Sequence, residues 1–141
     1  MKSSKFWLAV LVAGVVMNIL DYIIYGMWLG NAYFMQNTVL FRQDTNPIWY
    51  VIGDFVGVFV FVWVYSKISG SFGPTVQDGV KAGLYLGIFA NFPLWILMNL
   101  MLNGFPYSLS WISTIYGIIW CMIVGAIVAA VMKKKEAATA A

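Results

Sequence analysis

Apolar residues dominate the chain in four long stretches, at approximately residues 6–29, 48–67, 80–102 and 109–132. Each stretch is close to the length of about 20 helical residues that crosses a hydrocarbon core of about 30 Å. Backbone polar groups inside lipid must bond within their own segment, so we expect helices rather than strands. The pattern predicts an all-α, integral membrane four-helix bundle that forms a single transmembrane domain over residues 1–141.

Polar and turn-forming residues separate the four stretches. We expect connections at Gly30–Pro47 and Ile68–Gly79, and a tight turn at Asn103–Tyr107. The first connection also carries aromatic residues such as Phe34 and Phe41. It is therefore expected to lie along the outer interface or to pack on a partner.

The first stretch follows a short lysine-containing start, as a secretory signal would. Its apolar run is longer than the about 7–15 residues of such a signal, and it contains Asn18 and Asp21. We therefore expect it to be the first spanning helix.

The basic residues predict the orientation of the bundle. All the lysines fall on one predicted side, whereas Arg42 falls on the other. These lysines are Lys2, Lys5, Lys67, Lys81, Lys133, Lys134 and Lys135. By the positive-inside rule both termini are predicted to be cytoplasmic, in a multi-pass protein of a bacterial inner (plasma) membrane.

Composition narrows the classes of partner and cofactor. The chain is 62% hydrophobic and 9% charged, whereas a soluble domain usually carries about 25% charged residues. The net charge of +3 forms no continuous basic stripe, so we expect the lipid bilayer and no nucleic acid as a partner. Histidine is absent, which argues against haem or pigment ligation by this chain, and we expect no metal site.

Two aspartates interrupt the apolar stretches and are the most informative residues of the chain. Asp21 lies within Phe6–Trp28, and Asp54 lies within Ile48–Ser66. An aspartate near the centre of a spanning helix costs about 2.5–3.5 kcal/mol on insertion scales. Counting about 1.5 Å per residue places both about 10–12 Å below the outer surface. Each is therefore expected to serve either assembly or chemistry.

No lysine or arginine lies in the interior of a membrane stretch, away from its ends, to neutralise these carboxyl groups, and Arg42 is the one basic residue on the same predicted side. A charge without a partner is costly in a low-dielectric medium, and two nearby carboxylates resist ionising together. We therefore expect at least one of Asp21 and Asp54 to be protonated or strongly hydrogen-bonded.

Other polar side chains recur at spacings of three and four residues, which places them on shared helix faces. Together with the two aspartates they are expected to form an intramembrane polar cluster, open toward the outside, for assembly or for binding an ion. These residues are Asn18, Tyr22, Tyr25, Asn91, Asn99, Ser113 and Thr114.

Glycines in three of the stretches match the small-residue spacing that lets membrane helices approach closely. We expect them to pack helix against helix. They are Gly53, Gly57, Gly83, Gly87, Gly117 and Gly125.

Three functions are consistent with this pattern. The preferred one is a non-catalytic accessory or structural subunit that packs against other membrane proteins or itself as a homo-oligomer. The alternative is a small proton- or cation-coupled carrier or channel that uses Asp21 and Asp54. The third is a quinone- or lipid-binding membrane protein, and beyond such a ligand we expect no cofactor. Serine has no histidine partner and no phosphate-cradling glycine loop is present, so we expect no enzyme.

The second half of the chain resembles a family of small bacterial four-helix integral membrane proteins catalogued as a domain of unknown function. The similarity rests on Lys81-x-Gly83-x-x-x-Gly87, on Gly104-x-Pro106, on Tyr116 and on Gly125-Ala126-Ile127. The first stretch departs from the aromatic-rich pattern of that family. The resemblance implies the four-helix architecture and no activity.

Overall fold

The computed structural model of the chain describes residues 3–132, which form four long helical segments and, within that range, no strand. All four segments are long and apolar enough to cross a membrane. The predicted all-α, four-helix architecture is confirmed. Lys2 and Lys133–Lys135, on which part of the predicted orientation rests, lie outside the described residues. The elements are α1 (Ser3–Asp21), its π-helical continuation η1 (Tyr22–Phe34), α2 (Ile48–Phe72), α3 (Val76–Met101) and α4 (Tyr107–Met132).

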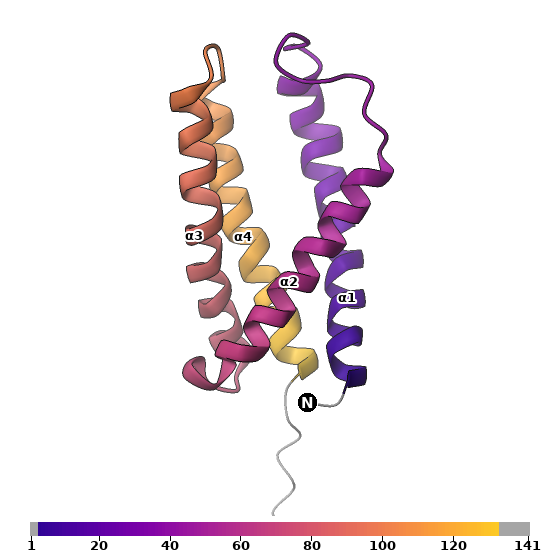
Figure 1. Ribbon diagram of the computed structural model, residues 1–141, viewed down its shortest axis with the longest axis vertical. Helices are drawn as coiled ribbons and strands as arrows, with labels where there is room; N and C mark the ends of the chain where they lie inside the picture. The colour runs from indigo at the N-terminus through magenta and orange to yellow at the C-terminus, as the bar shows by residue number, and fades with distance from the viewer. Residues whose placement is uncertain (1–2, 133–141) are drawn as a thin grey trace, which may run out of the picture.

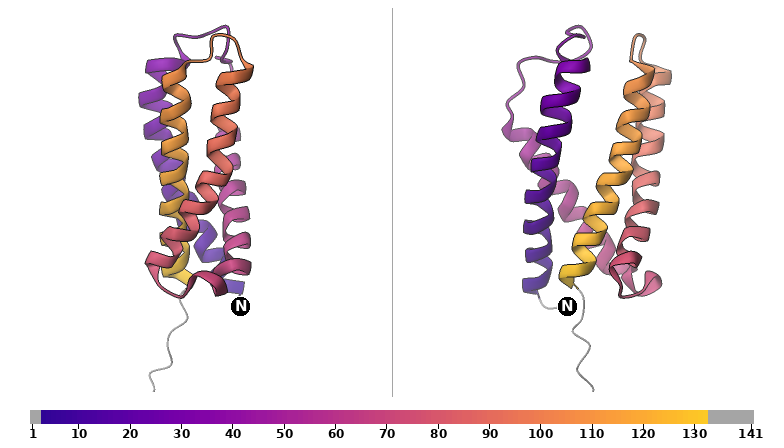
Figure 2. Two further views of the ribbon diagram at one scale, coloured as in Figure 1. Left: turned by 90° about the vertical axis from the view of Figure 1, so that its left-hand side faces the viewer. Right: turned by 180° about the vertical axis from the view of Figure 1, so that it is seen from behind.

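Helices α3 and α4 form an antiparallel hairpin, and the continuous α1–η1 segment stands opposite it (Figure 1). Helix α2 runs obliquely, from beside the α1–η1 segment toward the foot of α3 (Figure 1). The start of α1 and the end of α4 lie at the same end of the bundle, here called the terminal end (Figure 2). The η1–α2 loop and the α3–α4 turn lie at the opposite end, here called the loop end. The larger apolar core joins α1, α2 and α4 through Met17, Val58, Val62, Val124 and Val128.

The first helical segment continues to Phe34, beyond the predicted end at residue 29. From Tyr22 its backbone bonds run from residue i to residue i−5, and Met35 N still donates to Gly30 O at 2.9 Å. A π-helix is rare and occurs most often at functional sites. Side chains four and five residues apart share a face in this register, and Tyr25, Leu29 and Phe34 pack together on that face.

The second connection is much shorter than the predicted Ile68–Gly79. Helix α2 runs to Phe72, because its backbone bonds continue until Gly73 takes a positive φ of 103°. Helix α3 begins at Val76 behind a capping box, in which Thr75 and Asp78 bind each other's backbone N–H groups. The polar residues here form helix ends rather than a loop.

The predicted glycine contacts divide into two groups. Gly83 and Gly87 of α3 pack against the backbone of α4, close to Cys121 and Ile118. Gly125 of α4 packs in turn against the backbone of Gly79. Helix packing there follows the predicted spacing.

Gly53 and Gly57 of α2 pack against no other helix backbone among residues 3–132, and their packing against another subunit stays a prediction. Both are exposed, and no atom lies within 4 Å of the position that a Cβ of Gly53 would take. The oblique course of α2 carries this face away from its neighbours, so the two glycines line an open space instead.

Candidate functional site: an acidic cavity within the bundle

A cavity of about 620 Å³ lies between α2, α3 and α4, with one wall from the α1–η1 segment. Its apolar lining comes largely from α2 and α3. Its polar lining brings together residues from every helical segment. These polar residues are Asp21, Tyr25, Asp54, Asn91, Tyr116, Trp120 and Cys121.

Asp21 is the last residue of α1, at the point where the backbone changes to the π register. Its two carboxyl oxygens bind separate donors on α4. The Tyr116 hydroxyl donates to Oδ1, and Trp120 Nε1 donates to Oδ2 at 3.1 Å. Hydrogen bonds to a charged group are the stronger ones in proteins, so these two bonds hold α1 against α4 and fix the carboxyl group.

Asp54 projects from α2 toward the same cavity. It lies close enough to Asp21 for the two carboxyl groups to interact electrostatically and to share a hydrogen bond when one is protonated. Within residues 3–132, no tyrosine, tryptophan or other side-chain donor is hydrogen-bonded to the Asp54 carboxyl group, in contrast to Asp21. The structure therefore brings the two acids together and leaves Asp54 the freer of the pair.

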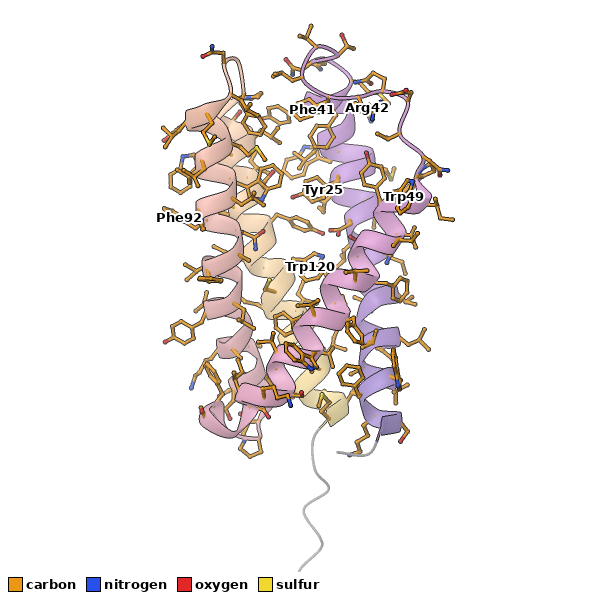
Figure 3. The ribbon with its side chains drawn as sticks, viewed as in Figure 1. Tyr25, Phe41, Arg42, Trp49, Phe92 and Trp120 are labelled. Carbon is orange, nitrogen blue, oxygen red and sulfur yellow. The ribbon has the colours of Figure 1, made fainter. Side chains whose placement is uncertain are left out.

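Among the residues that the structure describes, no basic residue contributes to the lining of this cavity. Arg42 lies in the η1–α2 loop, where it pairs with Asp44 at 3.7 Å (Figure 3). Both side chains of this pair are exposed. The acid pair thus has no cationic partner in the walls that surround it.

Tyr25 and Trp120 lie between α4 and the α1–η1 segment (Figure 3). The Tyr25 ring meets the Tyr116 ring edge to face, with centroids 5.4 Å apart, and stacks on Phe34 at 6.2 Å. Asn91 spans the α3–α4 contact: its side chain lies over Gly117, and its amide donates to Gly87 O at 3.1 Å. Tyr25 and Asn91 therefore belong to the site that contains the aspartates.

Several residues of the predicted polar cluster lie elsewhere. Tyr22 is 69% exposed, because it lies about a quarter-turn around the helix from Asp21. Asn99 donates to Phe105 O at 3.0 Å and so closes the α3–α4 turn. Asn18 donates to Gly14 O one turn back along its own helix. These three side chains do not line the cavity.

Ser113 and Thr114 are buried in α4 and also lie outside the cavity lining. Thr114 donates to Ser110 O at 2.7 Å within its own helix. The hydroxyl oxygens of Ser113 and Ser110 are buried with no hydrogen-bond partner among the described residues.

The sequence predicts that the polar cluster opens at the end of the bundle that carries the η1–α2 loop. In the structure the cavity is covered at this loop end. A second apolar cluster fills the loop end around Leu29, Phe105 and Leu109. Phe41 from the η1–α2 loop packs on Phe34 at 4.8 Å and on Phe105 at 6.1 Å. The loop therefore packs on its own chain and covers the site.

Access to the cavity lies instead between α2 and α3. These helices diverge from their short connection (Figure 1). The lining residues Val60, Phe89 and Leu94 are 48%, 79% and 48% exposed. They lie in the middle of membrane-length helices, so the opening faces the side of the bundle rather than an end.

Two residues of the site, Tyr116 and Trp120, were not predicted as polar partners. Their spacing of four residues places both on one face of α4. Trp120 also lies in the middle of its apolar stretch, away from the interface positions that tryptophan favours in membrane helices. That position is the signal that identifies it as a hydrogen-bond donor inside the bundle.

Comparison with known proteins adds no family: no protein-family model, no curated protein and no solved structure matches the chain. The resemblance to a small bacterial four-helix family stays a prediction.

Proposed function

We propose that this chain is a non-catalytic integral membrane protein that binds a proton or a cation at Asp21 and Asp54, as a small carrier or channel. One observation carries the proposal: the two carboxyl groups face a common cavity, and no basic residue among the described residues 3–132 lines it. A structural acid buried among apolar residues is normally neutralised by a fixed partner. A site that exchanges protons or cations must instead leave the place beside the carboxyl group free of a fixed partner.

The division of roles within the pair supports the same proposal. Asp21 is held by two donors from α4, whereas Asp54 comes from α2, which runs obliquely to the other helices (Figure 1). Intramembrane carboxyl groups with this kind of freedom are typical of ion and proton pathways. Four helices leave little room for alternating access within one chain, so we expect transport to take place in a homo-oligomer.

The expectation of an accessory or structural subunit is the second candidate. The exposed Gly53 and Gly57 of α2 favour it, because small residues on an open helix face permit close contact with another helix. In that function the aspartates act only as interhelical hydrogen-bond acceptors. Asparagine retains part of that bonding capacity.

Proton flux into reconstituted vesicles distinguishes the two functions. A pH gradient is imposed across vesicles that contain the wild-type protein, Asp54→Asn or Asp21→Asn, and a dye reports internal pH. We expect either substitution to abolish protein-dependent flux while the purified protein stays folded and monodisperse. Asp44→Asn is the matched control, because it removes an exposed loop carboxylate and should leave flux unchanged. No protein-dependent flux in the wild type would favour the structural subunit, and flux that survives both substitutions would contradict transport through the aspartates.

We further propose a bacterial inner membrane with both termini cytoplasmic. Lys5, Lys67 and Lys81 belong to helix turns near the terminal end, and Arg42 lies at the loop end (Figure 3). The positive-inside rule then assigns the terminal end to the cytoplasm.

A further inference from the structure

The cavity is far larger than a proton or a single metal ion requires. Its volume of about 620 Å³ falls within the range of about 300–1,000 Å³ that is typical of small-molecule sites. The residues that line it also make a poor site for an inorganic cation. Ca²⁺ takes about 6–8 oxygen ligands and Mg²⁺ requires near-octahedral geometry. Within the part of the chain that the structure describes, no three His, Cys, Asp or Glu side chains are placed to hold a metal ion.

The walls of the cavity suit a hydrophobic body. Helices α2 and α3 contribute aliphatic and aromatic side chains on either side of the opening, among them Phe61, Val64, Leu86 and Phe89. Such surfaces favour an apolar ligand by removing its surface from water. A ligand of this kind concentrates first in the hydrocarbon of the membrane, where the lateral opening lies.

The deep part of the cavity suits a positive charge. Tyr25 and Trp120 place aromatic rings in the lining beside the carboxyl groups. A cation over an aromatic face gains about 0.5–2 kcal/mol, with the higher value where water is excluded. The bond from Trp120 Nε1 to Asp21 fixes that ring in place before a ligand arrives.

The two aspartates indicate how many positive charges the ligand carries. Both oxygens of Asp21 are occupied by donors from α4, so Asp54 is the carboxyl group available to a ligand. One available carboxylate matches one positive charge.

From these observations we propose that the cavity binds an amphipathic organic monocation, which reaches Asp54 from the bilayer through the opening between α2 and α3. This inference rests on the proposed function, because it takes the acid pair as the cation site, and it names the class of ligand.

Two ions of the same shape and opposite charge test the inference. Tetraphenylphosphonium and tetraphenylborate are each titrated into the full chain in lipid nanodiscs, and binding is measured by equilibrium dialysis against protein-free nanodiscs. We expect saturable binding of the phosphonium at one site per chain or per oligomer, and no saturable binding of the borate. Equal saturable binding of both ions would overturn the inference, because the site would then select shape without charge.

Two substitutions locate the ligand. Asp54→Asn should weaken phosphonium binding by about tenfold or more, since it removes the charge that faces the cation. Gly57→Leu keeps both carboxyl groups but places a side chain in the cavity. A Cβ at Gly57 meets only Trp120, at 3.7 Å, so the fold should tolerate this change while binding is lost. Asp44→Asn should bind as the wild type does. Unchanged phosphonium binding in both cavity variants would overturn the inference.

The same proteins separate this inference from the proposed function. If Asp54-dependent proton flux persists and the phosphonium does not bind, the ligand class is wrong and the proton site stands. If Asp54→Asn alters neither flux nor binding, both proposals fail.

Discussion

Asp21 and Asp54 have the same side chain but different surroundings. Asp21 accepts from a phenol and an indole on α4, whereas Asp54 faces the cavity. A carboxylate with two donors is both oriented and stabilised, since hydrogen bonds to a charged group contribute more than neutral ones. Asp21 therefore has a structural role in addition to its place in the site, and Asp54 does not.

Removal of the Tyr116 hydroxyl should expose this structural role. We expect Tyr116→Phe to lower the free energy of unfolding by about 1–3 kcal/mol, because it leaves a half-buried carboxyl oxygen without its donor. Chemical unfolding in mild detergent measures the change. Tyr107→Phe is the matched control, since Tyr107 is 67% exposed near the start of the same helix. Equal stability of the two variants would show that the Tyr116–Asp21 bond holds nothing together.

At the scale of helices, the glycine pattern predicts packing only where the helices run side by side. A short turn joins α3 and α4 into a nearly antiparallel hairpin, so their glycines meet across the contact. A substitution there must displace backbone, because a Cβ on Gly83 would lie 2.7 Å from the Cα of Met122. The same spacing on α2 has no partner helix, because the course of α2 is oblique.

Gly83→Ala and Gly53→Ala should therefore change stability in opposite directions. Replacing glycine by alanine inside a helix ordinarily gains about 0.5–1 kcal/mol, and Gly53 offers open space for the new methyl group. At Gly83 the clash with α4 should outweigh that gain and destabilise the protein by about 1–3 kcal/mol. Thermal unfolding in detergent compares the two variants. A stabilised Gly83→Ala protein would contradict the packing described here.

Hydrophobic pattern was enough to predict the four spans, because burial in lipid depends on composition along one segment at a time. It failed at helix ends. Gly30 and Asn31 suggested a turn, yet the π-helix continues through both, and their backbone groups bond within it. The bond between Trp120 and Asp21 joins residues 99 positions apart. Such pairs depend on the rotation and crossing of whole helices, which no local spacing encodes.

At the scale of the whole molecule, the oblique course of α2 determines where the site opens. Helix α2 packs on α1 at one end and nears α3 at the other, so the middle of the α2–α3 boundary stays unfilled (Figure 1). The aromatic residues of the η1–α2 loop meanwhile cover the loop end. The site is therefore covered at the loop end and open along the side of the bundle.

The orientation of the bundle in the membrane determines which compartment each end of the cavity faces. Thiol labelling measures this orientation. The native Cys121 is buried and is first replaced by alanine. Val39→Cys then places a thiol at a position that is 98% exposed in the η1–α2 loop, and Ser71→Cys places one at the opposite end of α2. The lysines at the terminal end of α1, α2 and α3 predict that this end faces the cytoplasm and that the loop end faces outward. A membrane-impermeant reagent should therefore label Val39→Cys in intact cells. Ser71→Cys should react only after the cells are permeabilised. The reverse pattern would invert the topology and move the covered end of the cavity to the cytoplasmic face.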